Sequence, residues 1–184
     1  MYAELQVTTH FSFLRGASSC EELFAAAALL GIEALGVTDR NSVAGIVRAW
    51  DAAKATGVRL VPGCRLDLAS GESLLVWPTD RAAWSRLTRL LSSGRPQQPV
   101  DGKWQGKSEC RLGWDDVERW SEGLVAALVT GDAPDDAALR RLKDLFGDRA
   151  YAAISWRRRP GDMARIDALD RAARARGVVP LEDA

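Results

Sequence analysis

Two short polar segments, each at the end of an apolar strand pattern, have the spacing that could place metal ligands. Residues 3–8 alternate between apolar and polar side chains, so Gln6 and Thr8 would point into one cavity as an i, i+2 pair. The second segment, Thr38-Asp39-Arg40, ends another apolar run. A hydrolytic site for zinc or a hard divalent cation requires histidine or carboxylate at such positions. Because an amide and a hydroxyl bind these ions weakly, the simpler interpretation of Gln6 and Thr8 is ordinary interior polar residues.

The histidine and cysteine content restricts the other sites that the chain could build. His10 is the only histidine, whereas a site for several metal ions normally uses several. Cys20, Cys64 and Cys110 are widely spaced, which excludes a CxxC zinc site and favours reduced thiols over a disulfide scaffold. With no histidine near it in the sequence, Cys64 is a poor candidate for a nucleophile.

Length and charge indicate one globular domain of balanced charge. The 184 residues include 25 basic and 25 acidic side chains, so no global field draws the chain to nucleic acid or to a membrane. No apolar run approaches the roughly 20 residues that span a bilayer, and the N-terminus leads directly into a strand pattern. We therefore expect no secretory leader, no membrane contact and a cytoplasmic location.

Strand and helix patterns alternate along most of the chain, which predicts an α/β fold with a parallel sheet. The predicted strands span residues 3–8, 34–38, 59–62, 65–69, 73–77, 124–129, 150–155 and 178–181. The predicted helices span residues 19–30, 42–57, 80–91, 114–120 and 135–146, and a last one begins at residue 160. Ser19 and Glu22 form a capping-box pair at the start of the first helix.

The apolar residues of three helices predict which faces are buried. In the first helix the expected inward side chains are Leu23, Ala27 and Leu30; in the second they are Val43, Ile46, Val47 and Trp50; in the last they are Met163, Ile166, Leu169 and Ala173. Residues 92–113, rich in Gly, Pro, Gln and Lys, have no such period and predict a mobile surface loop within a single domain of residues 1–184.

Four segments in the first half of the chain are similar to one known family. They read YAELQVTTHFSFLRGAS (2–18), EELFAAAALLGIEALGVTDRNSVAGIVRAW (21–50), RLVPGCRLDL (59–68) and SLLVWPTDRAAWSRLTRLLSSG (73–94), with a looser match at WDDVERWSEGLVAALV (114–129). The chain resembles the N-terminal PHP (polymerase and histidinol phosphatase) domain of bacterial DNA polymerase III alpha-type enzymes, most closely that of their error-prone branch. This resemblance implies a distorted seven-stranded (β/α) barrel, here incomplete after residue 181.

The same resemblance implies where a metal site would lie, and the residue types there have changed. The family's His-x-His pair corresponds to Gln6 and Thr8, and its Thr-Asp-His to Thr38, Asp39 and Arg40. The remaining positions are Arg65 in place of an acidic residue, Ser73 in place of a histidine, and Arg157, Arg158 and Arg159 near a further histidine position. Arginine cannot coordinate a metal and stays charged. We therefore expect no metal, no other cofactor and no catalytic residue, and we expect Asp39 to form an ion pair with Arg40 or Arg65.

Three functions are compatible with these residues. The leading hypothesis is a metal-free, catalytically inactive PHP module that serves as the structural N-terminal domain of an error-prone DNA polymerase in translesion synthesis. Its partners would be the downstream polymerase domains or other translesion-synthesis proteins, with DNA contacted indirectly. One alternative is a residual phosphoesterase or 3′–5′ exonuclease. The other is a module that binds an anion or a nucleic-acid backbone through Arg40, Arg65, Arg157, Arg158 and Arg159.

A structural module should present apolar surface to its neighbours. Trp84, Trp114 and Trp120 lie outside the predicted inward faces, so we expect them to be exposed and available to a partner domain. The unpaired edge of the strand at residues 178–181 is a second expected contact.

Overall fold

The computed structural model describes residues 2–95 and 110–182, so most of the predicted loop at 92–113 lies outside the described residues. The chain divides into two compact units. Unit 1 comprises Met1–Asp67 and Leu75–Trp77, and unit 2 comprises Leu68–Leu74 and Pro78–Ala184. No helix in the described part of the chain is both long and apolar enough to cross a membrane.

The elements follow the predicted alternation of strands and helices. The strands are β1 (Ala3–Val7), β2 (Ala34–Val37), β3 (Arg59–Pro62), β4 (Cys64–Asp67), β5 (Ser73–Pro78), β6 (Leu124–Val129), β7 (Ala150–Ile154) and β8 (Val179–Glu182). The α-helices are α1 (Cys20–Leu30), α2 (Ile46–Thr56), α3 (Arg81–Ser93), α4 (Trp114–Trp120), α5 (Asp136–Phe146) and α6 (Asp162–Ala175). The predicted capping box of α1 is confirmed, because Ser19 and Glu22 exchange hydrogen bonds of 3.2 and 2.8 Å.

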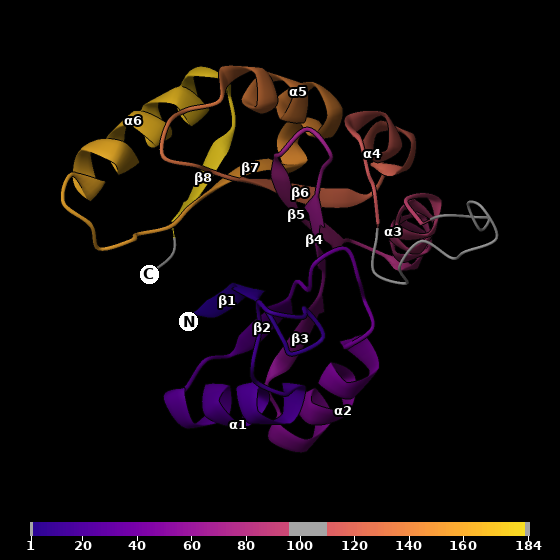
Figure 1. The fold of residues 1–184 in the computed structure, drawn as a ribbon. Coiled ribbons are helices and arrows are strands. Elements are labelled where there is room, and N and C mark those ends of the chain that lie inside the picture. Colours follow the sequence, from indigo (N-terminus) through magenta and orange to yellow (C-terminus); the bar gives the residue numbers. More distant parts are fainter. Residues whose placement is uncertain (1, 96–109, 183–184) are drawn as a thin grey trace. The chain divides into compact units, whose positions relative to one another are not determined.

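Unit 1 is built on a parallel sheet with the strand order β1-β2-β3. Helices α1 and α2 lie next to each other on one side of this sheet (Figure 1). Their sheet-facing residues join strand residues such as Val37 in a single apolar core, to which α1 contributes Phe24 and Ala27 and α2 contributes Ala49 and Ala52.

Part of the predicted burial on these two helices is wrong. Ala27 is buried and Leu23 partly so, but Phe24 takes the central position of α1 and Leu30 is exposed. On α2 the fully buried residues are the two alanines, whereas Val47 and Trp50 are largely exposed. Small residues at a packing face let a helix lie close to its neighbour. The prediction followed the large apolar side chains. Ile46 does pack against this core, but Val47 and Trp50 do not belong to the buried face.

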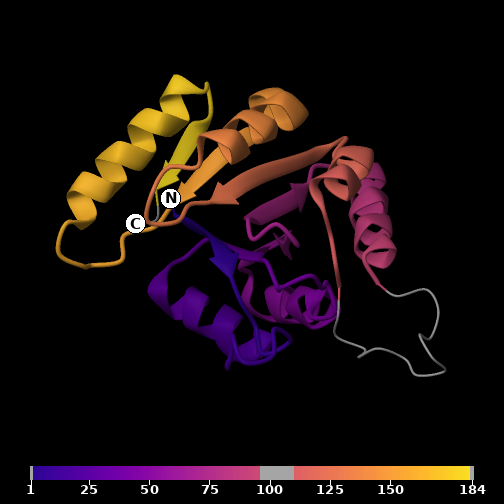
Figure 2. The same ribbon diagram turned by 45° about the horizontal axis from the view of Figure 1, so that its top comes forward.

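Unit 2 contains a parallel arrangement of β6, β7 and β8. Helices α5 and α6 cover the same side of these strands (Figure 2). Their inner faces include Leu142 and Phe146 from α5, and Leu169 and Ala173 from α6. Of the residues predicted to face inward on α6, Leu169 and Ala173 are buried, Ile166 is half-buried and Met163 is exposed.

The prediction of exposed tryptophans is also wrong. Trp114 is buried and donates a 3.1 Å hydrogen bond through its ring nitrogen to Glu72, while Trp84 and Trp120 are half-buried. Helix α4, which carries Trp114, packs beside α3. The exposed tryptophans of the described residues are Trp50 and Trp156.

The α/β class is confirmed, and the closed barrel is not seen in the described residues. The hydrogen-bonded strands form two sheets, with the orders β1-β2-β3 and β4-β5-β6-β7-β8, and the boundary between the two units passes through β5. Closure of these strands into a seven-stranded barrel therefore stays a prediction.

Candidate functional site

The first residue of interest, Asp39, lies in unit 1 just beyond the C-terminal end of β2, where parallel α/β folds place their sites. Its carboxylate is almost completely buried and accepts three hydrogen bonds from the segment that follows β1. The Thr9 N–H and the Ser12 hydroxyl donate to Oδ1 at 2.9 and 2.6 Å, and the Thr9 hydroxyl donates to Oδ2 at 2.7 Å.

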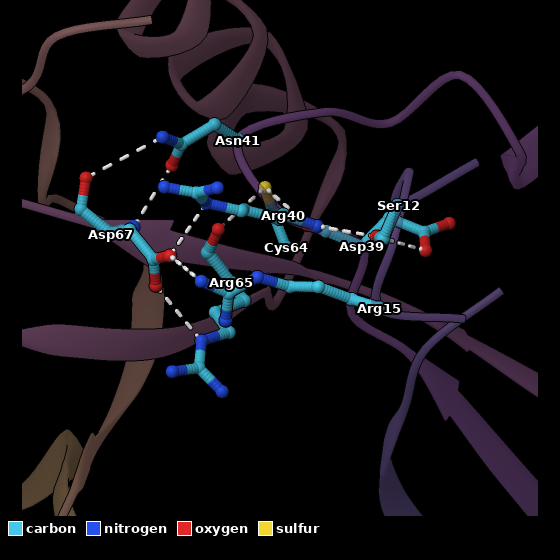
Figure 3. A network of polar contacts seen from close by, with 8 residues as sticks. All are labelled: Ser12, Arg15, Asp39, Arg40, Asn41, Cys64, Arg65 and Asp67. Carbon is cyan, nitrogen blue, oxygen red and sulfur yellow. Dashed lines mark hydrogen bonds and ion pairs between the residues drawn. The ribbon is translucent and has the colours of Figure 1, made fainter. Parts of the chain in front are cut away.

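The segment after β1 is folded so that these donors point at Asp39. The Ser12 N–H bonds to the Thr9 carbonyl at 3.0 Å, which closes a turn, and the Thr38 N–H ties β2 to Val7 at 2.8 Å. The Ser12 hydroxyl also accepts the Arg40 N–H at 2.9 Å (Figure 3). Gly45 packs over the site, because a Cβ on it would lie 3.1 Å from Asp39 Oδ2 and 2.9 Å from Phe11. Asp39 is therefore enclosed, with both oxygens committed to the protein.

The arginines expected to pair with Asp39 pair with Asp67 instead, so that expectation is wrong. Asp67 Oδ2 lies 2.6 Å from Arg40 Nε and 3.5 Å from Arg15, and Oδ1 lies 2.9 Å from Arg65 Nε (Figure 3). Arg65 and Asp67 are two residues apart on β4 and so share one face of the strand. An isolated bridge pairs Arg40 with Arg65 in parallel, which brings both guanidinium groups to the same carboxylate.

The side chains of Asn41 and Cys64 extend this network through hydrogen bonds to backbone groups. Asn41 adopts a positive φ of 45°, and its side-chain oxygen accepts the Asp67 N–H at 2.9 Å. The Cys64 thiol is buried. Its sulfur lies 3.3 Å from the Asp39 carbonyl oxygen and 3.5 Å from that of Ser42, and its single hydrogen can be donated to either. Burial, with the Asp39 charge as a second cause, raises the pKa of the nearby Cys20 thiol. Both cysteine side chains are fully buried and contribute to the packing of this unit.

No group of three or more His, Cys, Asp or Glu side chains that could hold a metal ion occurs among the described residues. Asp39 is surrounded by hydroxyl and amide donors, and Asp67 by guanidinium groups, so neither carboxylate offers an open face to a cation. His10 is exposed, and its Nδ1 lies 3.2 Å from the Ser18 carbonyl. The side chains that the structure describes at these positions therefore do not form the ligand set of a divalent metal.

Comparison with known proteins identifies the family. Residues 4–160 match the PHP domain family over most of the chain. The chain belongs to the PHP domain family. It is 60% identical over 168 residues to "Error-prone DNA polymerase 3" of Agrobacterium fabrum, which covers 90% of this chain and 15% of that protein. It is 45% identical over 186 residues to "Error-prone DNA polymerase" of Caulobacter vibrioides, covering 95% of this chain and 16% of that protein. The chain thus spans about one-sixth of the length of these relatives.

Solved structures with the same PHP-like fold are distant in sequence. An amidohydrolase from Chromobacterium violaceum matches with a TM-score of 0.66 at 15% identity, over 100% of this chain and 87% of its own. A lesion-specific endonuclease from Pyrococcus furiosus matches with a TM-score of 0.51 at 12% identity, over 82% of this chain and 41% of its own. At these identities the likeness concerns the fold alone.

The predicted PHP-site positions fall in different parts of the structure. Asp39, Arg40 and Arg65 come together in unit 1, where Gln6 and Thr8 are half-buried at the end of β1. Ser73 begins β5 and belongs to unit 2. Arg157, Arg158 and Arg159 also belong to unit 2, in the segment between β7 and α6. A single cavity lined by both arginine groups stays a prediction.

Four residues that organise the PHP site were missed from the sequence: Thr9, Ser12, Arg15 and Asp67. The alternation Cys64-Arg65-Leu66-Asp67 carried a signal for Asp67, because residues two apart on a strand face the same way. The role of Thr9 and Ser12 had no such signal, since their partner lies 27 to 30 residues away in the sequence.

Proposed function

We propose that this PHP domain is a metal-free, catalytically inactive module that serves as the structural N-terminal domain of an error-prone DNA polymerase used in translesion synthesis. Polymerisation itself would belong to domains beyond this chain, which is consistent with the small share of the relatives' length that it matches. Closure of the strands into the distorted seven-stranded barrel is part of this proposal.

One observation carries the proposal: the single carboxylate left at the PHP-site positions is used for folding. Asp39 is enclosed by Thr9, Ser12 and Gly45, and its oxygens accept hydrogen bonds that the buried hydroxyl groups require. A cation at this carboxylate would have to displace those donors.

The exposed apolar residues support a role as part of a larger assembly. Leu30, Val47 and Trp50 on α1 and α2 are all more than half exposed. Large apolar side chains that remain in water are typical of surfaces that contact another protein or domain. These residues replace Trp84, Trp114 and Trp120 as candidates for contact with the remaining polymerase domains.

Hydrolysis of a phosphodiester tests the proposal against the phosphoesterase alternative. The purified chain should show no Mn²⁺-dependent cleavage of bis-p-nitrophenyl phosphate or of a 3′-labelled oligonucleotide above the level of buffer. A variant that restores the family's ligand types, Gln6→His/Thr8→His/Arg40→His/Arg65→Glu, provides the matched control for the missing ligands. Mn²⁺-dependent cleavage by the unmodified chain, abolished by Asp39→Asn, would refute the proposal.

A further inference from the structure

The segment between β7 and α6 borders an open hollow in unit 2. Residues 155–161 leave the C-terminal end of β7 and turn into α6, and the hollow has a volume of about 640 Å³. The residues that line it include Trp156, Arg158, Arg159 and Met163. This is the edge of a parallel sheet at which α/β proteins bind their ligands.

The backbone of this segment is held in place by one buried aspartate. Asp162 Oδ2 accepts the N–H groups of Arg157 at 2.6 Å and Arg158 at 2.9 Å, and Oδ1 accepts Arg165 Nε at 2.7 Å. The Asp162 N–H in turn bonds to the Arg159 carbonyl at 3.1 Å. Burial alone would raise the pKa of Asp162, but Arg165 and these N–H groups outweigh it and lower that pKa. The segment is therefore preorganised around a charged carboxylate.

Two of the neighbouring arginines are used to anchor the segment. Arg157 pairs with Asp132 and donates to the Thr130 carbonyl at 3.2 Å. Arg165 also donates to the carbonyls of Ser155 and Gly131. Their guanidinium groups are part of the framework and are not available to a ligand.

The side chains of Arg158 and Arg159 are exposed, and no ion pair joins either of them to a carboxylate of the described residues. Arg158 adopts a positive φ of 56°, which is uncommon for a residue other than glycine. Trp156 is 59% exposed beside them. The framework thus holds two free positive charges and an aromatic ring on one rim.

We propose that Trp156, Arg158 and Arg159 form a contact site for single-stranded nucleic acid. A base would stack on the indole of Trp156, and the flanking phosphates would be contacted by the two guanidinium groups. This proposal goes beyond the structural role above, because it gives the domain a direct contact with the template or with a displaced strand.

The combination of groups selects this ligand over others. Free phosphate would use the arginines and leave the indole without a role. In duplex DNA the bases are stacked on each other, so the flat ring could reach no base face without unpairing. The basic charge complements the nucleic-acid backbone, and the relatives are named DNA polymerases.

Binding of a fluorescein-labelled dT₁₅ to the purified chain, followed by fluorescence anisotropy at several salt concentrations, tests the proposal. Trp156→Ala should weaken binding roughly 5- to 150-fold, the range expected for loss of one base stack, whereas Trp156→Phe should retain most of the affinity. Arg158→Asn/Arg159→Gln should lower the slope of log K against log salt by about 1.4, the value for two phosphate contacts on a single strand. Asn is chosen at position 158 because it tolerates a positive φ.

The matched control removes the same charge elsewhere in unit 2. Arg140→Gln/Arg171→Gln alters exposed arginines on α5 and α6 and should leave both the affinity and the salt slope close to those of the unmodified chain. Melting temperatures of all variants establish that they are folded. The proposal is overturned if the unmodified chain does not bind dT₁₅ at about 50 mM salt, where screening is weaker than at physiological ionic strength. Equal weakening by the control pair, or equal affinity of the chain for a duplex, would overturn it as well.

Discussion

Asp39 in unit 1 and Asp162 in unit 2 both organise a segment at the C-terminal end of a parallel strand, with opposite results for the arginines around them. Both carboxylates are buried, and both accept three hydrogen bonds. Around Asp39, the neighbouring Arg40 and Arg65 are drawn onto a second carboxylate, Asp67. Around Asp162, the carboxylate fixes the backbone, while the side chains of Arg158 and Arg159 are exposed and pair with no carboxylate of the described residues. The number of arginines near a sheet edge therefore does not determine how much positive charge is left free for a ligand. That free charge depends on whether nearby carboxylates already neutralise the arginines.

The donors also differ between the two aspartates. Asp39 is satisfied by two hydroxyl groups and one N–H from a segment 27 to 30 residues earlier in the chain. Asp162 is satisfied by residues three to five positions away. Asp39 therefore joins two strands of the core, whereas Asp162 shapes a local turn.

The largest effect is expected from Asp39→Ala. It leaves the Thr9 N–H and the hydroxyls of Thr9 and Ser12 without their buried acceptor, which should lower the free energy of unfolding by about 4 kcal/mol. For a chain of this size that corresponds to a melting temperature lower by roughly 10 °C. Thermal unfolding followed by circular dichroism measures it, with Ser12→Ala as the single-donor comparison at about 1–2 kcal/mol. A loss of less than about 1 kcal/mol for Asp39→Ala would show that this carboxylate does not hold the two strands together.

A smaller and pH-dependent effect is expected from Asp162→Asn. The folded-state pKa of Asp162 is lowered, so its contribution to stability is fully present above the unfolded pKa of about 4 and is lost as the pH falls through the lower folded value. The variant should melt at a lower temperature than the unmodified chain at pH 7, and the two should converge in strongly acidic buffer. Melting curves from pH 7 to pH 2 provide the measurement. A difference that stays constant across this range would mean that the charge of Asp162 is not what fixes the segment.

The smallest effects on stability are expected from the exposed arginines. Arg40→Gln breaks a half-exposed ion pair and should cost about 0.5–1 kcal/mol, less at high salt. Arg158→Asn removes a side chain that pairs with no carboxylate in the described structure, so stability should change by less than about 0.5 kcal/mol. Urea unfolding of both variants at low and high salt distinguishes them. Equal losses would contradict the distinction between neutralised and free arginines.

The sequence predicted the features that depend on neighbouring residues. The Ser19–Glu22 capping box and the alternation of strands and helices are local patterns, and both are confirmed. The predicted buried stripe of α2 was Val43, Ile46, Val47 and Trp50. Of these, Ile46 packs against the core, whereas the fully buried positions are Ala49 and Ala52. Which face of the helix is buried depends on how closely the helix approaches the sheet. This distance cannot be derived from the order of apolar residues along the chain.

The candidate site was predicted in its composition but not in its pairing. The sequence indicated that Asp39 stands among arginines and not among metal ligands, and it gave Asp39 an arginine partner. The structure gives it hydroxyl partners, because the turn after β1 places Thr9 and Ser12 within 3 Å while β4 carries its own carboxylate at Asp67. Such pairings between distant segments are fixed by the fold, so they could not be derived from residue types alone.

The metal content of the purified chain tests the central claim most directly. After dialysis against Mn²⁺ and Zn²⁺ and then against metal-free buffer, elemental analysis should find no stoichiometric metal, and calorimetric titration with Mn²⁺ should give only the heat of dilution. The account predicts this result because Asp39 and Asp67 are already committed to protein donors. One or more tightly held ions per chain, lost in Asp39→Asn, would contradict it.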